Sequence, residues 1–201
     1  MCPYIEPIET NTKFVILMHP KEFKKVKNNT GFFTHLSLTN SELFIGVDFS
    51  AHQRINEIVA THESYILFPS AYALNLSQTR PLMPNQKKMA IFIIDSTWAC
   101  TKKMFTQSTN LKALLHMSFT TEKTSQYQIK EQPQSNYLST IESTLVVLEE
   151  LVKWDVESVE QEKMDGFLRP FTKMIEYQQK LISQSLNNSI RFKSKSYHEI
   201  F

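Results

Sequence analysis

Glycine is scarce in this chain, which has only three glycines among 201 residues: Gly31, Gly46 and Gly166. Loops that cradle phosphates need several glycines within a few residues, because the backbone must approach the ligand closely. No two of the three lie close together in sequence. The sequence therefore excludes a Walker-type phosphate loop and the dinucleotide fingerprint of Rossmann folds.

Cysteine is equally rare, and the only two cysteines, Cys2 and Cys100, lie far apart. They form neither a disulfide framework nor a paired metal-ligand motif, which fits a reducing cytoplasm. Neither cysteine has a supporting histidine nearby in sequence, and no serine lies in a nucleophile-elbow sequence. Covalent hydrolase chemistry thus has no specific support.

Long apolar segments are missing as well. The longest strongly apolar run lies near Met89 to Ile94, which is far too short to cross a bilayer. The first residues, Met-Cys-Pro-Tyr-Ile-Glu, contain no basic stretch leading into an apolar one. We therefore expect a soluble cytoplasmic protein that makes no membrane contact.

The charge balance is nearly even, with a formal net charge of +2. Charge alone does not indicate a nucleic-acid binder, although unevenly placed lysines could form a local basic patch. With 41% hydrophobic residues, the chain can bury one substantial core. We expect one main domain over residues 1–155 and a helical extension over 156–201 packed on it, with a loosely ordered tail from Asn187.

Three continuous apolar runs predict buried strands, over residues 13–18, 63–68 and 88–94. Continuous rather than alternating runs are typical of strands covered on both faces, so helices should flank a mostly parallel sheet. A turn over 28–31, a possible helix over 32–37 and a short apolar patch over 43–47 come between the first two runs. The predicted fold class is α/β.

Helices are predicted over residues 98–105 and 140–154, the second with Ser139 or Thr140 as its cap. A further helical pattern over 157–185 is interrupted at Arg169-Pro170, because proline cannot continue a helix from within.

Three of the apolar runs end in polar or proline-marked segments, beginning at His19, Pro69 and Asp95. Ligands bind outside the carboxyl ends of strands in open α/β sheets, so these three loops could line one crevice. Asp95 directly follows the most apolar run, where partial desolvation would make its carboxylate a useful base. The alternative is that Asp95 caps the helix that follows it.

Several neighbours of these loops also have two interpretations. Trp98 is either a core aromatic or a stacking platform, and His19 is either a structural partner or an acid, base or phosphate contact. The lysines near the same loops either clasp phosphates or form an ordinary solvated face. These lysines are Lys21, Lys24, Lys25, Lys27, Lys102 and Lys103.

The order of short segments along the chain carries more information than any one of them. They are Cys2-Pro3 with Pro7-Ile8-Glu9-Thr10, His19-Pro20-Lys21-Glu22, Asn29-Thr30-Gly31, Leu67-Phe68-Pro69-Ser70, Asp95-Ser96-Thr97-Trp98, Lys102-Lys103-Met104 and Leu138-Ser139-Thr140-Ile141-Glu142. In order and spacing from Cys2 to Leu151, the sequence resembles the DTW-domain family, and Asp-x-Thr-Trp followed by Lys-Lys-Met is its most specific part.

The resemblance implies a tRNA-uridine aminocarboxypropyltransferase. Such an enzyme transfers the 3-amino-3-carboxypropyl group of S-adenosylmethionine to N3 of a uridine in tRNA and releases 5′-methylthioadenosine. The implied fold is α/β and related to the knotted, SPOUT-like RNA methyltransferases, with residues 1–155 as the catalytic domain.

The resemblance also implies roles for individual residues. Asp95, Thr97 and Trp98 would be catalytic. The cofactor pocket would be formed by Leu67, Pro69, Ser70, Ile94, Ser96, Leu138, Thr140 and Glu142. RNA would be bound by His19, Lys21, Lys27, Asn29, Thr30, Lys102, Lys103 and Lys130.

The sequence departs from the family pattern at a few positions. Glycine is common where Ser96 stands, and arginine is common where Lys130 stands; lysine keeps the charge but loses the bidentate fork. Only Cys2 remains of an N-terminal cysteine cluster in many relatives, so we expect no zinc. Two alternatives stay open: an RNA methyltransferase, and a non-catalytic RNA-binding module.

Overall fold

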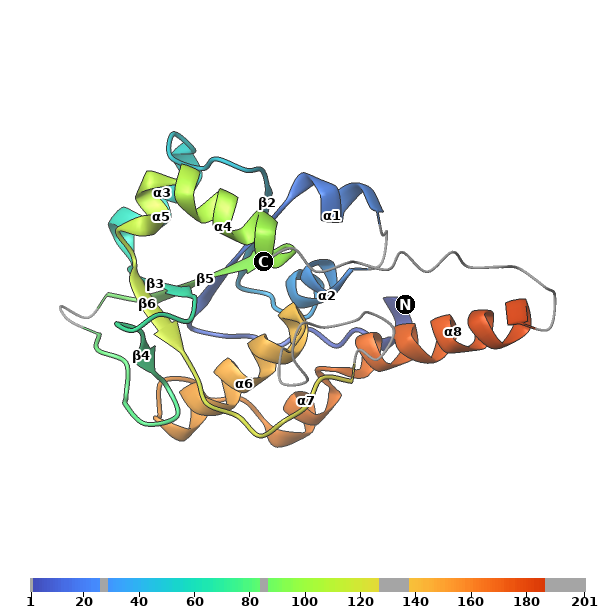
Figure 1. Ribbon diagram of the computed structural model, residues 1–201. Helices are drawn as coiled ribbons and strands as arrows, with labels where there is room; N and C mark the ends of the chain where they lie inside the picture. The colour runs from blue at the N-terminus through green and yellow to red at the C-terminus, as the bar shows by residue number, and fades with distance from the viewer. Residues whose placement is uncertain (1, 26–28, 84–86, 127–137, 187–201) are drawn as a thin grey trace.

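The protein, described by a computed structural model over residues 2–25, 29–83, 87–126 and 138–186, is built on a parallel sheet of six strands. The strand order is β2-β1-β5-β3-β6-β4, and every pairing is parallel. Helices cover both faces of this sheet (Figure 1). The predicted α/β class is confirmed.

In chain order the elements are η1 (Cys2–Tyr4), β1 (Lys13–Met18), α1 (Pro20–Lys25), α2 (Thr30–Leu36), β2 (Ser41–Ile45), α3 (Gln53–Thr61), β3 (Glu63–Leu67), β4 (Leu74–Asn75), β5 (Met89–Asp95), α4 (Trp98–Gln107), α5 (Thr109–Lys112), β6 (Leu115–Ser118), α6 (Thr140–Lys153), α7 (Gln161–Gly166) and α8 (Arg169–Leu186).

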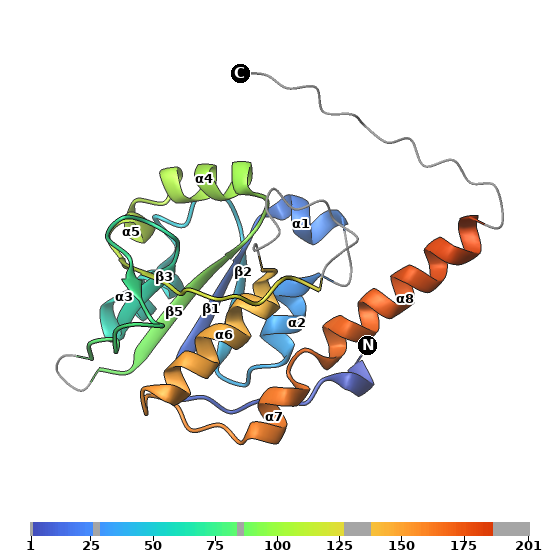
Figure 2. The same ribbon diagram turned by 60° about the horizontal axis from the view of Figure 1, so that its bottom comes forward.

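Alternate residues of the central strands enter two separate hydrophobic cores. Phe14 and Ile16 of β1 pack with α2, α6, α7 and the start of α8, whereas Val15 and Leu17 pack with α3, α4 and α5. Figure 2 shows these two groups of helices on opposite sides of the sheet. Because successive side chains of a strand point to opposite faces, a strand buried on both faces needs an unbroken apolar run.

The predicted strands and the two main helices are confirmed within about two residues at each end. Helix α6 begins with a capping box in which the Ser139 amide donates to the Glu142 carboxylate at 2.8 Å. The interruption predicted at Arg169-Pro170 is also real: α7 ends at Gly166 and α8 begins at Arg169. Pro170 lies in the first turn of α8, where a missing N–H costs nothing.

The turn predicted just before Phe32 is wrong where the structure describes it. Thr30 and Gly31 are the first residues of α2, and the Asn29 side chain caps that helix by accepting from the Phe32 amide at 2.8 Å. Gly31 does not have a positive φ. An Asn-Thr-Gly segment suits a turn or a capped helix start, and tertiary packing chose the second.

Several short elements were not predicted from the sequence. Helix α3 buries only Ile55 and Ile58, and β4 and β6 are very short strands at the far edge of the sheet. Helix α1 occupies most of the basic segment after Pro20. Such elements leave a weak periodic signal because few of their side chains enter the core. The predicted tail from Asn187 lies outside the described residues.

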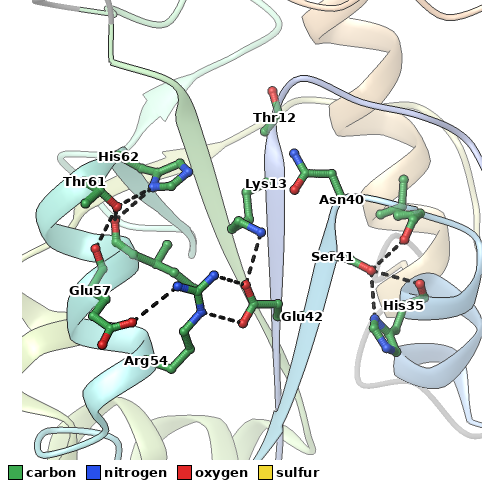
Figure 3. A network of polar contacts seen from close by, with 12 residues as sticks. Thr12, Lys13, His35, Asn40, Ser41, Glu42, Arg54, Glu57, Thr61 and His62 are labelled. Atoms are coloured by element: carbon green, nitrogen blue, oxygen red, sulfur yellow. Dashed lines mark hydrogen bonds and ion pairs between the residues drawn. The ribbon is translucent and has the colours of Figure 1, made fainter.

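A network of ion pairs holds the edge strand β2 in place (Figure 3). The Glu42 carboxylate accepts from Lys13 on β1 at 3.1 Å and from Arg54 on α3 at 2.7 and 3.0 Å. Arg54 also contacts Glu57 at 3.3 Å. The hydrogen bond from Arg54, supported by the charge and hydrogen bond of Lys13, lowers the pKa of Glu42 to about 2.

Helix α8 runs outward from the body of the protein, and η1 lies beside its start (Figures 1 and 2). Its first turns are anchored in the core by Phe171, Met174 and Ile175. None of the helices within the described ranges is long and apolar enough to cross a membrane.

Candidate functional site

The carboxyl ends of β1 and β5 lie side by side at the centre of the sheet, with Met18 opposite Asp95. After β1 the chain leads to β2 on one side, and after β5 it leads to β6 on the other side. This reversal is the topological switch point at which open α/β sheets bind their ligands. The His19 amide donates to the Asp95 carbonyl at 3.1 Å and joins the two strand ends.

Asp95 is 7% exposed, and its side chain is held from two helices. Its Oδ1 accepts from the Thr140 hydroxyl at 2.6 Å, at the start of α6, and lies 3.4 Å from the Thr30 hydroxyl, at the start of α2. The N-cap of α4 is Thr97 rather than Asp95. The capping alternative is therefore wrong, and the carboxylate faces the helices on the other side of the sheet.

Gly31 leaves the space into which the Asp95 carboxylate fits. A Cβ added at Gly31 would lie 2.5 Å from Asp95 Oδ2 and 2.9 Å from the Met18 methyl carbon. Those separations are too short for real atoms, so any side chain there would displace the carboxylate. Sequence reasoning did not place Gly31 in the site, although the scarcity of glycine in the chain was a usable signal.

His19 lies beside Asp95 and is 6% exposed. Burial, with smaller contributions from the positive charges of Lys21 and Lys103, lowers the pKa of His19 despite the opposing charge of Glu22. The Lys21 amide donates to His19 Nδ1 at 3.1 Å, so the neutral ring carries its proton on Nε2. His19 is thus a neutral hydrogen-bond donor among basic side chains.

Helix α1 and the start of α4 lie at the same end of the sheet (Figures 1 and 2). Lys21 on α1 and Lys102 and Lys103 on α4 are all exposed there. Trp98, in the first turn of α4, is 46% exposed, so it is not a core aromatic. This end of the molecule therefore combines positive charge with an accessible indole ring.

Ser96 stands at the position where the family resemblance leads us to expect glycine. Its hydroxyl lies 2.7 Å from the Thr101 hydroxyl on α4 and 3.1 Å from the Thr97 carbonyl. The Ser96 hydroxyl is therefore hydrogen-bonded within the first turn of α4.

The predicted cofactor loops meet at the same edge. Ile66 pairs with Phe92; Leu67 follows one residue later at the end of β3, and Ile94 follows two residues later near the end of β5. Pro69 and Ser70 continue directly from β3, and Ser70 is hydrogen-bonded to His116 on β6. Leu138 is half-buried just before α6.

Two residues predicted to contact ligands also have partners within the protein. Glu142 is 5% exposed and accepts from the Ser139 and Ser125 hydroxyls at 2.6 and 2.8 Å and from the Gln126 amide at 2.7 Å. It therefore shapes the site by fixing the segment that leads into α6. Asn29 is buried as the cap of α2, with its Nδ2 3.5 Å from Met18 Sδ.

Lys27 and Lys130, both predicted to bind RNA, lie outside the described residues. Within the part of the chain that the structure describes, no three His, Cys, Asp or Glu side chains are grouped to hold a metal ion.

Two curated proteins are similar in sequence to this chain. The mouse (Mus musculus) protein "tRNA-uridine aminocarboxypropyltransferase 2" is 29% identical over 161 residues, which are 76% of this chain and 53% of that protein. The protein of the same name from Macaca fascicularis matches with the same identity and coverage. The chain spans about half the length of these curated relatives. No solved structure matches significantly.

The family model of the DTW domain matches residues 1–179, which include Asp95, Thr140 and all elements from η1 through the first turns of α8. The chain belongs to the DTW-domain family.

Proposed function

We propose that this protein transfers the 3-amino-3-carboxypropyl group of S-adenosylmethionine to N3 of a uridine in tRNA. The observation that carries the proposal is the buried Asp95 carboxylate, held by Thr140 and Thr30 at the switch point of the sheet. The names of the curated relatives support the coarser part of the proposal, the transfer of an aminocarboxypropyl group to a uridine of tRNA.

The side chains at this edge fit such a donor substrate. The Asp95 carboxylate, flanked by the hydroxyls of Thr140 and Thr30, suits a cationic molecule that carries an amino acid and a ribose. Leu67, Ile94 and Leu138 are half-buried at the ends of β3 and β5 and just before α6, and they would offer apolar contacts for the adenine ring. When bound, S-adenosylmethionine supplies a carbon activated by its sulfonium and leaves as 5′-methylthioadenosine.

Asp95 would serve as the base. Uridine N3 is a poor nucleophile until it loses its proton, which Asp95 would accept directly or through one water. The nitrogen lone pair then forms the new N–C bond while the carbon–sulfur pair returns to sulfur. Thr140 and Thr30 hold the carboxylate in one orientation, which lowers the cost of aligning the reactants.

The RNA would approach from the end where α1 and α4 lie. Lys21, Lys102 and Lys103 would bind phosphates, with Lys27 and Lys130 as further candidates, and neutral His19 would donate from Nε2. A uridine whose edge is hidden by pairing must be exposed or flipped out, and Trp98 would stack on it. Asn29 would contact the RNA and Glu142 would line the cofactor pocket, and both also fix the helix starts beside Asp95.

The decisive experiment is mass spectrometry of nucleosides from a tRNA transcript incubated with the purified protein and S-adenosylmethionine. Aminocarboxypropyluridine together with 5′-methylthioadenosine supports the proposal. A methylated nucleoside with S-adenosylhomocysteine would identify a methyltransferase instead. Unmodified tRNA that still binds the protein would identify a non-catalytic RNA-binding module.

A pair of aspartate variants tests the assignment of the base. Asp95→Asn should keep the fold and lose nearly all product, whereas Asp165→Asn, at an exposed residue of helix α7, should keep wild-type activity. Near wild-type turnover by Asp95→Asn would remove Asp95 from the mechanism. Circular dichroism of both variants controls for folding.

Two further features of the proposal concern the protein as a whole. The knotted, SPOUT-like path of the chain is tested by an experimental structure that traces residues 127–137. A cytoplasmic location is tested by fractionating cells that produce the tagged protein.

A further inference from the structure

His116 on β6 makes a specific contact with the loop after β3. It pairs with Ile66 across the two parallel strands, and its side chain is half-buried. Its Nδ1 lies 2.8 Å from the Ser70 hydroxyl, a contact that spans 46 residues of sequence. The hydrogen bond therefore joins the outer part of the sheet to the loop that follows β3.

Two phenylalanine rings determine how the His116 ring is oriented. Phe68 and Phe105 stack in parallel, with ring centroids 4.8 Å apart and an interplanar angle of 3°. The His116 ring meets both at an angle of about 75°, with centroids 5.7 and 5.5 Å away. Edge-to-face contacts with two neighbours oppose rotation of the imidazole, so its Nδ1 stays directed at Ser70.

The backbone around Ser70 is held by two further bonds. The Phe68 amide donates to the Met117 carbonyl at 2.9 Å, and the Ala73 amide donates to the Ser70 carbonyl at 3.1 Å. These bonds secure the start of the loop and close its turn. The contact with His116 is the bond that places the Ser70 side chain itself.

We propose that His116 is a positioning residue that holds the Pro69–Ser70 loop in the geometry that binds S-adenosylmethionine. This inference rests on the proposed function, in which that loop is part of the cofactor pocket. His116 does not touch the reacting atoms, since it acts through Ser70. Its loss should therefore weaken cofactor binding and leave turnover at saturating cofactor nearly unchanged.

Three variants and their combination test this role. His116→Leu and Ser70→Ala each remove the hydrogen bond. The double variant loses the same single bond as either of them. His116→Asn keeps a polar atom near the position of Nδ1 and should rescue the contact. His62→Leu is the matched control, because His62 caps the end of α3 just before the amino end of β3, whereas Ser70 follows the carboxyl end of that strand.

Calorimetry should show S-adenosylmethionine affinity falling about three- to ten-fold in His116→Leu and in Ser70→Ala, the range expected for one hydrogen bond. The double variant should be no weaker than either single variant, because the two changes break the same bond. His116→Asn and His62→Leu should bind like the wild type. In the ligand-free protein, the same non-additivity should appear in the free energy of unfolding.

Failure of the proposed function and failure of the role of His116 would give different results. Wild-type protein that binds no S-adenosylmethionine would overturn the proposed function and, with it, the role of the loop. Wild-type protein that binds, with unchanged affinity in His116→Leu or independent losses in the double variant, would overturn only the role of His116. Loss of kcat with unchanged affinity would also contradict a positioning role.

Discussion

The hydroxyl of Thr140 donates a 2.6 Å hydrogen bond to the Asp95 carboxylate and so joins the start of α6 to the end of β5. These residues belong to motifs that are far apart in the sequence. Since α6 is anchored in the core by Ile141 and Leu148, its position sets the orientation of the carboxylate. Changes at the start of this helix should therefore act on the chemistry of Asp95.

Thr140→Val should lower turnover strongly, whereas Thr140→Ser should retain most of it. Valine has the shape of threonine but cannot donate to Asp95, and serine keeps the donor. Losing a hydrogen bond to a charged group should also cost about 1–3 kcal/mol of folding free energy. Turnover measured at saturating substrates, with urea unfolding of each variant, checks this prediction. Equal activity of the valine and serine variants would contradict it.

Gly31→Ala should disturb the site more than the addition of one methyl group usually does. The new methyl group would collide with Asp95 Oδ2, and overpacking of this kind typically costs about 1–3 kcal/mol. We expect lower stability and a much larger relative loss of transfer activity, because the carboxylate must move.

Gly166→Ala is the matched control for that change. A Cβ at Gly166 would have its nearest neighbours 3.6 Å away, which is ordinary contact. This variant should have wild-type activity and unchanged or slightly raised thermal stability. Similar behaviour of the two alanine variants, measured by calorimetry and product formation, would show that Gly31 has no special relation to Asp95.

Substitutions of the two tryptophans should affect different properties, one the affinity for tRNA and the other the stability of the fold. Trp98 is 46% exposed, while Trp154 is half-buried and its Nε1 donates to the Leu76 carbonyl at 2.7 Å. Stacking of one base on an aromatic ring contributes about 1–3 kcal/mol, so Trp98→Ala should weaken tRNA binding by roughly ten-fold or more. Its melting temperature should change little.

Trp154→Phe should lower the stability of the protein without weakening tRNA binding. It loses one hydrogen bond, worth about 0.5–1.5 kcal/mol of stability, and should bind tRNA like the wild type. Filter binding and thermal unfolding of both variants make the comparison. A Trp98→Ala protein that binds tRNA with full affinity would exclude stacking on this ring.

Glu42 should make the free energy of unfolding depend on pH in the acid range. Its folded-state pKa of about 2 lies below the ordinary value of 4.5, so its contribution is present above about pH 4.5. That contribution is lost as pH falls from about 4.5 toward 2, because the unfolded chain binds the proton first. Glu42→Gln should therefore narrow the difference in unfolding free energy between pH 5 and pH 3. A difference as wide in the variant as in the wild type would contradict this role.

Much of the architecture could be predicted from local pattern. The runs that became β1, β3 and β5 are continuous because both faces of the sheet are covered, and α6 shows its cap and its apolar face in sequence. Short or edge elements such as α3, β4 and β6 could not be predicted, since few of their residues are buried.

The candidate site could likewise be predicted only in part from the sequence. By itself, the sequence determined that Asp95 and His19 end buried strands, because an apolar run that stops at a polar residue is a local feature. Only the tertiary structure placed β5 between β1 and β3, seated the carboxylate against Gly31, and brought His116 to Ser70. Strand order and side-chain contact depend on packing between distant segments, which no local pattern of residues contains.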